Sequence, residues 1–173
     1  LARAYATLVN DGYFVNPIML LNNKKNITDK KIIENSTSKK IRELLRAVVT
    51  DTDYTGPRVR IEGYEIGAKT GTAELIDSGK YNENANRTAF VSIFPSSDPE
   101  FLVLAIIENP KKIKEENFSI TAATVVAPLV KNIILNMIKI IGIPQLSNNE
   151  IIKANLDNNI TLKNNVTFWY YKK

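Results

Sequence analysis

The 173-residue sequence contains no cysteine and no histidine. The lack of cysteine excludes disulfides, thiolate nucleophiles and the usual zinc sites, and the lack of histidine excludes a Ser-His-Asp triad. Long apolar runs are absent too: the best candidate, residues 121–143, contains Pro128, Lys131 and Lys139. We interpret it as an amphipathic helix, not as a membrane span. The sequence predicts no metal site and no cofactor.

Charge is modest and scattered. The net charge is +5, and the lysines occur mainly in pairs such as Lys24-Lys25 and Lys111-Lys112, with no aromatic residues between them. This pattern favours a solvated surface over a nucleic-acid footprint, so we expect no nucleic-acid partner. The length fits one domain with a real core. No signal peptide is present, and because the chain begins at Leu1 in the middle of a pattern, we expect it to be a piece of a longer protein.

The most informative stretch is Gly63-Tyr-Glu-Ile-Gly-Ala-Lys-Thr-Gly-Thr-Ala-Glu74. Its first half alternates as a half-buried strand does, from Tyr64 to Ala68. The alternation then gives way to Lys69-Thr-Gly-Thr72, whose polar groups would need partners inside a sheet. An exposed sheet edge suits these residues better, since a peptide can pair with the main chain there and a glycine permits close approach. We therefore predict an edge strand that binds a carboxylate.

The segment Lys69-Thr-Gly-Thr-Ala73 resembles the Lys-Thr-Gly box of the penicillin-binding proteins and serine β-lactamases. Its flanks "LARAYATLVNDGYFVNP", "EGYEIGAKTGTAE" and "TAFVSIFPSSDPEFLVLAIIENP" resemble class B penicillin-binding proteins in the same order, and "TAATVVAPLVKNII" is most similar to the septal, cell-division type. The resemblance covers residues 1–144. It implies that 1–144 form the C-terminal part of a transpeptidase domain, whereas 145–173 form a tail of uncertain structure.

The resemblance implies an α+β fold in which helices, including a long C-terminal one, cover an antiparallel sheet with three strands in this chain. From the sequence pattern we expect helices over 1–10 (capped by Gly12), from a cap at Ser36 or Thr37 to about 50, and from 119 or 121 to 141. The last helix would cover the sheet with an apolar face made of Val125, Leu129, Ile133, Ile134, Met137, Ile140 and Ile141. We expect a short strand at 31–34 and a polar loop at 75–87 between two antiparallel strands, the second at 88–94. The apolar run 101–108 predicts a strand covered on both faces and lying inward of the motif strand. For the tail we expect a short helix at 148–156 and a strand at 165–171.

Residue roles follow from the resemblance alone. Lys69 and Thr72 would be catalytic: Lys69 supplies positive charge beside the reacting groups, and the Thr72 N–H forms half of an oxyanion hole. Thr70, Gly71 and Thr72 would bind the substrate or a β-lactam, with Thr70 on the carboxylate and Gly71 keeping the edge bare. As an alternative from the residues themselves, Lys69 is a surface lysine that guards an edge strand against aggregation.

The family's reaction needs two further boxes, Ser-x-x-Lys and Ser-x-Asn, in front of the third. Ser36-Thr-Ser-Lys39 matches the first only as letters, because it falls between the positions of the second and third boxes. The piece alone should therefore be inert. The leading hypothesis is part of a septal peptidoglycan D,D-transpeptidase in the inner membrane, its domain periplasmic, anchored by a missing N-terminal helix. Its partners would be the D-Ala-D-Ala stem peptide, β-lactams and division proteins. The alternatives are a β-lactamase or D,D-carboxypeptidase, or a non-catalytic module that binds division partners.

Overall fold

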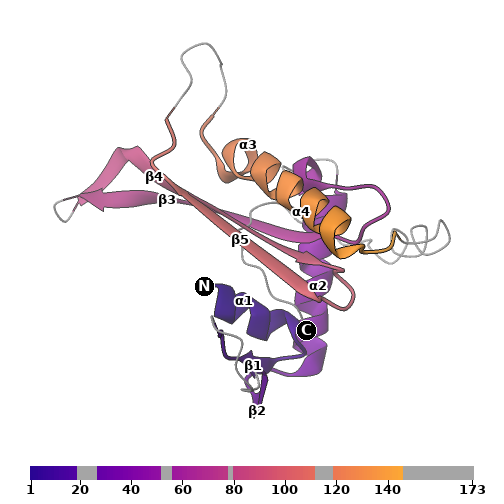
Figure 1. Cartoon of the computed structure of the whole chain (residues 1–173). Coiled ribbons are helices and arrows are strands. Elements are labelled where there is room, and N and C mark those ends of the chain that lie inside the picture. Colours follow the sequence, from indigo (N-terminus) through magenta and orange to yellow (C-terminus); the bar gives the residue numbers. More distant parts are fainter. Residues whose placement is uncertain (19–26, 52–55, 78–79, 112–118, 146–173) are drawn as a thin grey trace.

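A three-stranded antiparallel sheet lies between two groups of helices (Figure 1). The computed structural model describes residues 1–18, 27–51, 56–77, 80–111 and 119–145. In chain order the elements are α1 (Ala2–Val9), β1 (Tyr13–Val15), β2 (Ile27–Lys31), α2 (Asn35–Thr50), the 3₁₀ turn η1 (Gly56–Val59), β3 (Gly67–Asp77), β4 (Lys80–Phe94), β5 (Phe101–Glu108), α3 (Ala122–Val125) and α4 (Ala127–Ile141).

The strand order of the main sheet is β3-β4-β5, so the motif strand β3 is an edge strand, as predicted. The prediction for the 101–108 strand was wrong among the described residues: β4 is the central strand, and β5 pairs on one side only. Its coverage is also incomplete, since Phe101, Leu102 and Val103 are buried whereas Ile106 is 47% exposed. The first half of β5 alone behaves as a core strand.

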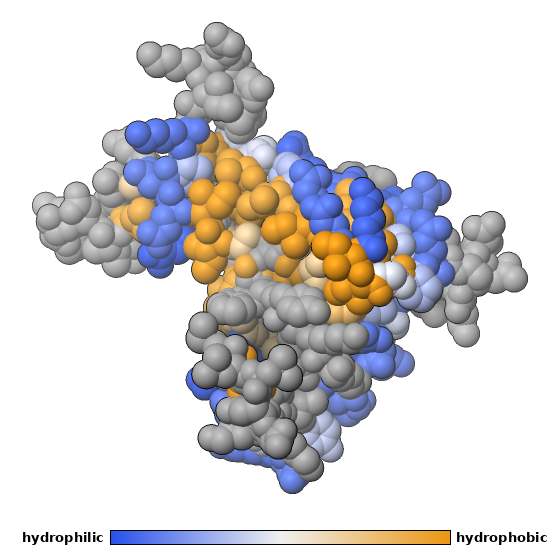
Figure 2. Space-filling model, viewed as in Figure 1, coloured by the Kyte–Doolittle hydropathy of each residue, from blue (hydrophilic) through white to orange (hydrophobic). Residues whose placement is uncertain are grey.

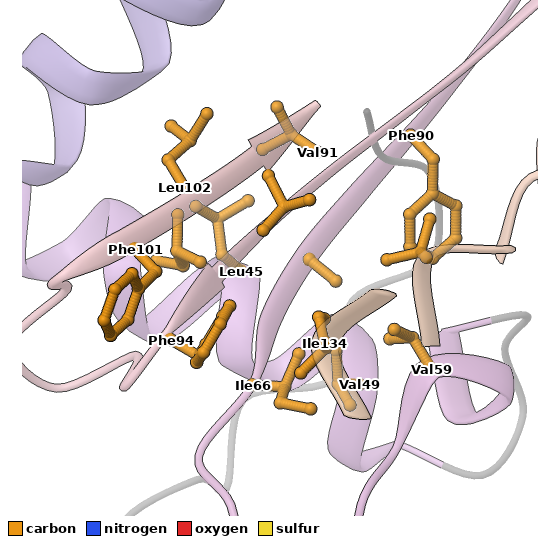
Figure 3. Close-up of a cluster of buried hydrophobic side chains, with 14 of the residues drawn as sticks. Leu45, Val49, Val59, Ile66, Phe90, Val91, Phe94, Phe101, Leu102 and Ile134 are labelled. Carbon is orange, nitrogen blue, oxygen red and sulfur yellow. The ribbon is translucent and has the colours of Figure 1, made fainter. Parts of the chain in front are cut away.

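Helices α1 and α2 lie on one face of the sheet, and α3 and α4 lie on the other (Figure 1). Side chains from both layers form one apolar cluster, in which Phe94 stacks on Phe101 with ring centroids 5.0 Å apart (Figure 3). At Gly67 an added Cβ would lie 2.9 Å from Ile93 Cγ1 and 3.2 Å from Leu45 Cβ. Because Leu45 belongs to α2, this contact shows that Gly67 and the residues in register with it face α2.

The end of α1 is held by α2. The hydroxyl of Ser38 donates to the Leu8 carbonyl at 2.7 Å, and Arg42 donates to the Val9 carbonyl at 2.9 Å and pairs with Asp11 at 2.8 Å. These donors satisfy carbonyls that have no partner within a helix end. The predicted cap at Gly12 was wrong by two residues: Asn10 caps α1, and Asp11 and Gly12 with positive φ then reverse the chain.

Two local predictions before the motif were also wrong. The short strand is residues 27–31, not 31–34, and it pairs with β1. Helix α2 begins at Asn35 after an extended Glu34, so neither Ser36 nor Thr37 is its cap. Glu34 makes no side-chain cap hydrogen bond. The start of α2 is therefore set by tertiary contacts, namely the β1–β2 hairpin before it and the Ser38 hydrogen bond to Leu8, and not by a capping side chain.

The motif strand and its neighbour are longer than the pattern indicates. The predicted polar loop over 75–87 was wrong, since β3 runs to Asp77 and β4 starts at Lys80, with Leu75 paired to Asn82. The motif strand also starts later than predicted, at Gly67, after a turn that contains Gly63. Backbone pairing needs no apolar alternation, so the ladder continues where the side-chain pattern ends.

Of the two predicted starts, 119 and 121, the C-terminal helix uses the second: Thr121 is its cap and exchanges hydrogen bonds with Thr124 in a capping box. It is broken at Val126, and Pro128 lies in the first turn of α4, where proline is tolerated. The end at Ile141 with left-handed Gly142 agrees with the prediction.

The predicted apolar face of this helix was partly wrong. Val130 and Ile134 are buried, whereas Leu129, Ile133 and Ile140 are 43%, 38% and 84% exposed. Ile134 is buried and Val125, Met137 and Ile141 pack partly buried against the core as predicted, so the prediction fails at Leu129, Ile133 and Ile140. In the part of the chain that the structure describes, no helix is long and apolar enough to cross a membrane. The expectations for 148–156 and 165–171 and most of the charged 111–117 loop lie outside the described residues.

Candidate active-site edge

The register of the sheet fixes which way the motif side chains point. Lys69 lies opposite Val91, and Thr70 lies opposite Phe90. Since Gly67 faces α2 and side chains alternate along a strand, Lys69 and Gly71 share the α2 face, and Thr70 and Thr72 share the face of α3 and α4. Lys69 and Thr70 thus point to opposite faces of the sheet. Only groups at the margin between the two faces can reach one ligand together.

The same register directs the main-chain groups. Asn109 N donates to the Asn86 carbonyl at 2.7 Å, which continues the β4–β5 ladder and marks residues of even number in β4 as bonded to β5. Hydrogen-bonded and non-bonded pairs alternate in an antiparallel ladder, so odd-numbered residues of β4 bond to odd-numbered residues of β3. The N–H and C=O groups of Thr70 and Thr72 therefore point toward the edge of β3 that no described strand pairs with, where an added strand or an oxyanion would meet them.

Lys69 is half-buried, and this partial burial lowers the pKa of its ammonium group below the ordinary lysine value because it disfavours the charged form. Thr72 is exposed. Thr70 is only 5% exposed, and its hydroxyl has no hydrogen-bond partner among the described residues. An unpaired buried hydroxyl costs free energy, and the described residues supply no acceptor for the hydroxyl of Thr70.

Gly71 is open on its α2 side. An added Cβ would meet a single atom within 4 Å, Ala89 Cβ at 3.7 Å, which is ordinary van der Waals contact. Gly67, four residues earlier, has no such room. The packing of the chain therefore explains a glycine at 67 and leaves the glycine at 71 without a packing reason.

The motif Ser36-Thr-Ser-Lys39 does not join this site. It lies in the first turns of α2, where that helix packs on α1, and its buried hydroxyl, Ser38, is bonded to Leu8. Arg58 and Arg60, which flank the loop before the motif, are exposed. The site within the described residues is thus a single strand margin, and a nucleophile is not part of it.

Sequence reasoning missed Arg46. Its side chain is 9% exposed and donates to the Ile66 carbonyl at 3.4 Å, just before β3 begins. An arginine within the run "IRELLRAVV" gives no signal of burial, because the sequence pattern alone does not show whether its side chain faces solvent. Only the approach of α2 to β3 reveals its position.

Comparisons with known proteins identify the family of this chain. Residues 1–134 match the family model described as the penicillin binding protein transpeptidase domain. The match covers more than half of the chain, so the chain belongs to this family, and the fold and the class B resemblance predicted from sequence are confirmed.

Among individual relatives, the chain is 36% identical over 122 residues to the stage V sporulation protein D of Bacillus subtilis. This aligned stretch covers 70% of this chain and 18% of that protein. It is 31% identical over 157 residues to a probable peptidoglycan D,D-transpeptidase PenA of Neisseria flavescens, covering 89% of this chain and 38% of that protein. Penicillin-binding protein 3 of Mycobacterium tuberculosis, solved with ampicillin, superimposes with a TM-score of 0.66 and 25% identity, over 85% of this chain and 35% of that chain. The chain thus spans well under half the length of these relatives.

Proposed function

We propose that this chain is the C-terminal part of a peptidoglycan D,D-transpeptidase of the septal type, and that its β3 edge is one wall of the transpeptidase site. One observation carries the proposal: on the β3 edge, Gly71 leaves open space beside the half-buried Lys69, and the main-chain groups of Thr70 and Thr72 point outward at the same place. Membership of the transpeptidase family and relatives named as D,D-transpeptidases support it, and they do not favour a β-lactamase or a non-catalytic module.

In the proposed reaction a serine of the complete protein, outside residues 1–173, attacks the carbonyl between the two D-alanines of a stem peptide. The C–N bond breaks, D-alanine leaves, and the amine of a second stem peptide then displaces the serine from the acyl-enzyme. The Thr72 N–H stabilises the oxyanion, and the Lys69 ammonium lies where proton transfer and the terminal carboxylate both gain from positive charge. The Thr70 hydroxyl donates to that carboxylate, which satisfies its missing hydrogen bond.

The proposal extends to the surroundings of the complete protein. β-Lactams would occupy the same edge as the stem peptide, because their carboxylate takes the place of the peptide terminus. A segment outside this chain would anchor the protein in the inner membrane with the transpeptidase domain in the periplasm, where division proteins would be its partners. A boundary near residue 144 would separate this domain from the tail.

Labelling of the complete protein by a fluorescent penicillin tests the proposal. We expect Lys69→Ala to slow labelling by about 10²- to 10³-fold, the cost of removing one preorganised group from such a site. Lys111→Ala is the control, since Lys111 is an exposed lysine beyond β5, and it should label as the parent does. Normal labelling of Lys69→Ala would refute the role of Lys69, and no labelling of the parent protein would refute the transpeptidase assignment.

A further inference from the structure

Three successive carbonyls hold the chain just where it enters β3. The Glu65 carbonyl accepts from Ser96 N at 2.8 Å, the Ile66 carbonyl accepts from Arg46 Nη1 at 3.4 Å, and the Gly67 carbonyl accepts from the Ser92 hydroxyl at 3.2 Å. The donors come from the β4–β5 turn, from α2 and from β4. Among these three, only Arg46 ties the strand to a helix.

Arg46 makes this contact at a high cost. Its side chain is buried, and its Nε atom has no hydrogen-bond partner among the described residues. Burial lowers the pKa of the guanidinium group, the charge of Glu65 opposes that shift, and the charge of Arg60 adds to it. Buried cations with incomplete partners contribute little to stability, and apolar residues of similar size often replace them without loss. Stability therefore does not account for an arginine here.

The position of Arg46 offers another account. β3 is bonded to β4 on one side, and in the described chain no strand holds its other side. Arg46 follows Leu45, the residue that contacts Gly67, so this turn of α2 fixes both the height and the lateral position of β3 at its start. Lys69 follows Ile66 by three residues. A shift of about 1 Å at a catalytic group can cost on the order of 10²-fold in rate.

We propose that Arg46 is a positioning residue, which sets the place of Lys69 and of the Thr72 N–H by holding the Ile66 carbonyl. The inference rests on the proposed function, because it concerns the acylation step of that site. The inference assigns different roles to two arginines that lie one helical turn apart on α2. Arg42 binds the Val9 carbonyl and Asp11 at the α1 junction and serves stability, whereas Arg46 serves the geometry of the edge.

The test measures the rate of acylation by a fluorescent penicillin and the melting temperature of the complete protein, for Arg46→Met, Arg46→Lys and Arg42→Met. We expect Arg46→Met to slow acylation about tenfold or more while its melting temperature stays within about 3 °C, since a methionine fills the volume without a buried charge. Arg46→Lys should recover part of the rate, because an ammonium group can still donate to one carbonyl. Arg42→Met should lower the melting temperature by several degrees and keep the parent rate.

Acylation of Arg46→Met at the parent rate would overturn the inference. So would a loss of rate that accompanies an equal loss of stability in both methionine variants, or an Arg46→Met protein that does not fold, since each result makes Arg46 a structural residue. Absence of labelling in the parent protein is a different failure, because it overturns the proposed function and this inference with it.

Discussion

The two edge strands of the sheet are opposites in chemistry. β3 carries a lysine, two threonines and an open glycine in its middle, whereas β5 reads Phe-Leu-Val-Leu-Ala-Ile-Ile and has its one charged residue, Glu108, at the end. Figure 2 shows apolar surface gathered along β5. A strand edge exposes unpaired main-chain groups in either case. The difference agrees with the proposal that the β3 edge receives a small polar ligand, and it leaves β5 with an apolar edge that no described strand pairs with.

The alternation of hydrogen-bonded pairs also shows which main-chain groups of β5 point away from β4. Since residues of odd number in β5 bond to β4, the N–H and C=O groups of Leu102, Leu104 and Ile106 point to the outer edge. Natural edge strands protect themselves with lysine, proline or bulges. The outer edge of β5 has none of these between residues 101 and 107. We therefore expect different behaviour of the two edges when each is altered.

The largest effect should come from the apolar edge. We predict that residues 1–173 expressed alone dimerise, swap strands or aggregate through β5, and that Ile106→Lys restores a monomer in sedimentation, because a charge on an edge strand opposes strand addition. Ile140→Lys is the control: Ile140 on α4 is 84% exposed against 47% for Ile106, so the change removes more exposed apolar surface without touching the edge. A clean monomer of the parent chain would contradict the prediction.

Gly71 tests the polar edge. Gly71→Ala should reduce acylation of the complete protein about tenfold or more, since the methyl group enters the path of the ligand, and should change the free energy of unfolding by less than about 1 kcal/mol. Gly67→Ala should behave in the reverse way, with a loss of about 1–3 kcal/mol of stability because its Cβ would lie 2.9 Å from Ile93. Denaturant titration and labelling kinetics separate the two. Equal stability loss in both variants would give Gly71 a packing role.

The pH dependence of the β3 edge is a third test. Because burial lowers the pKa of Lys69, the folded protein releases this proton at a lower pH than the unfolded chain. Acylation should therefore fall as the pH rises through a value below the ordinary lysine range, whereas the stability contributed by this group rises with pH over the same window. Lys69→Arg should move the alkaline fall in rate beyond the measurable range. A fall in rate at the same pH in Lys69→Arg would assign it to another group.

The sequence was sufficient where a local rule decides the outcome. The Thr121 cap, the end at Gly142 and the edge position of Lys69–Thr72 all follow from residues close in the chain or from the motif. It was insufficient where tertiary contacts decide: the start of α2, the long β3–β4 ladder and the buried stripe of α4 depend on what packs against them. Arg46 belongs to this second group, since its burial depends on the distance between α2 and β3. The roles of Lys69, Thr70, Gly71 and Thr72 stay predictions.

The smallest expected effect separates stability from function at a single hydroxyl. Thr70→Val keeps the shape of the side chain and removes an oxygen that has no partner among the described residues. We predict that the variant is more stable by about 1 kcal/mol, because a buried polar group without a hydrogen bond is replaced by a methyl group, and that it acylates several-fold more slowly, because the ligand carboxylate loses a donor. Thr88→Val is the matched control: its hydroxyl is bonded to the Ile107 carbonyl at 3.1 Å, so that variant should lose stability and keep its rate. A Thr70→Val protein that loses stability would show that the hydroxyl is satisfied within the fold, and the polar edge would then hold one ligand group fewer than we propose.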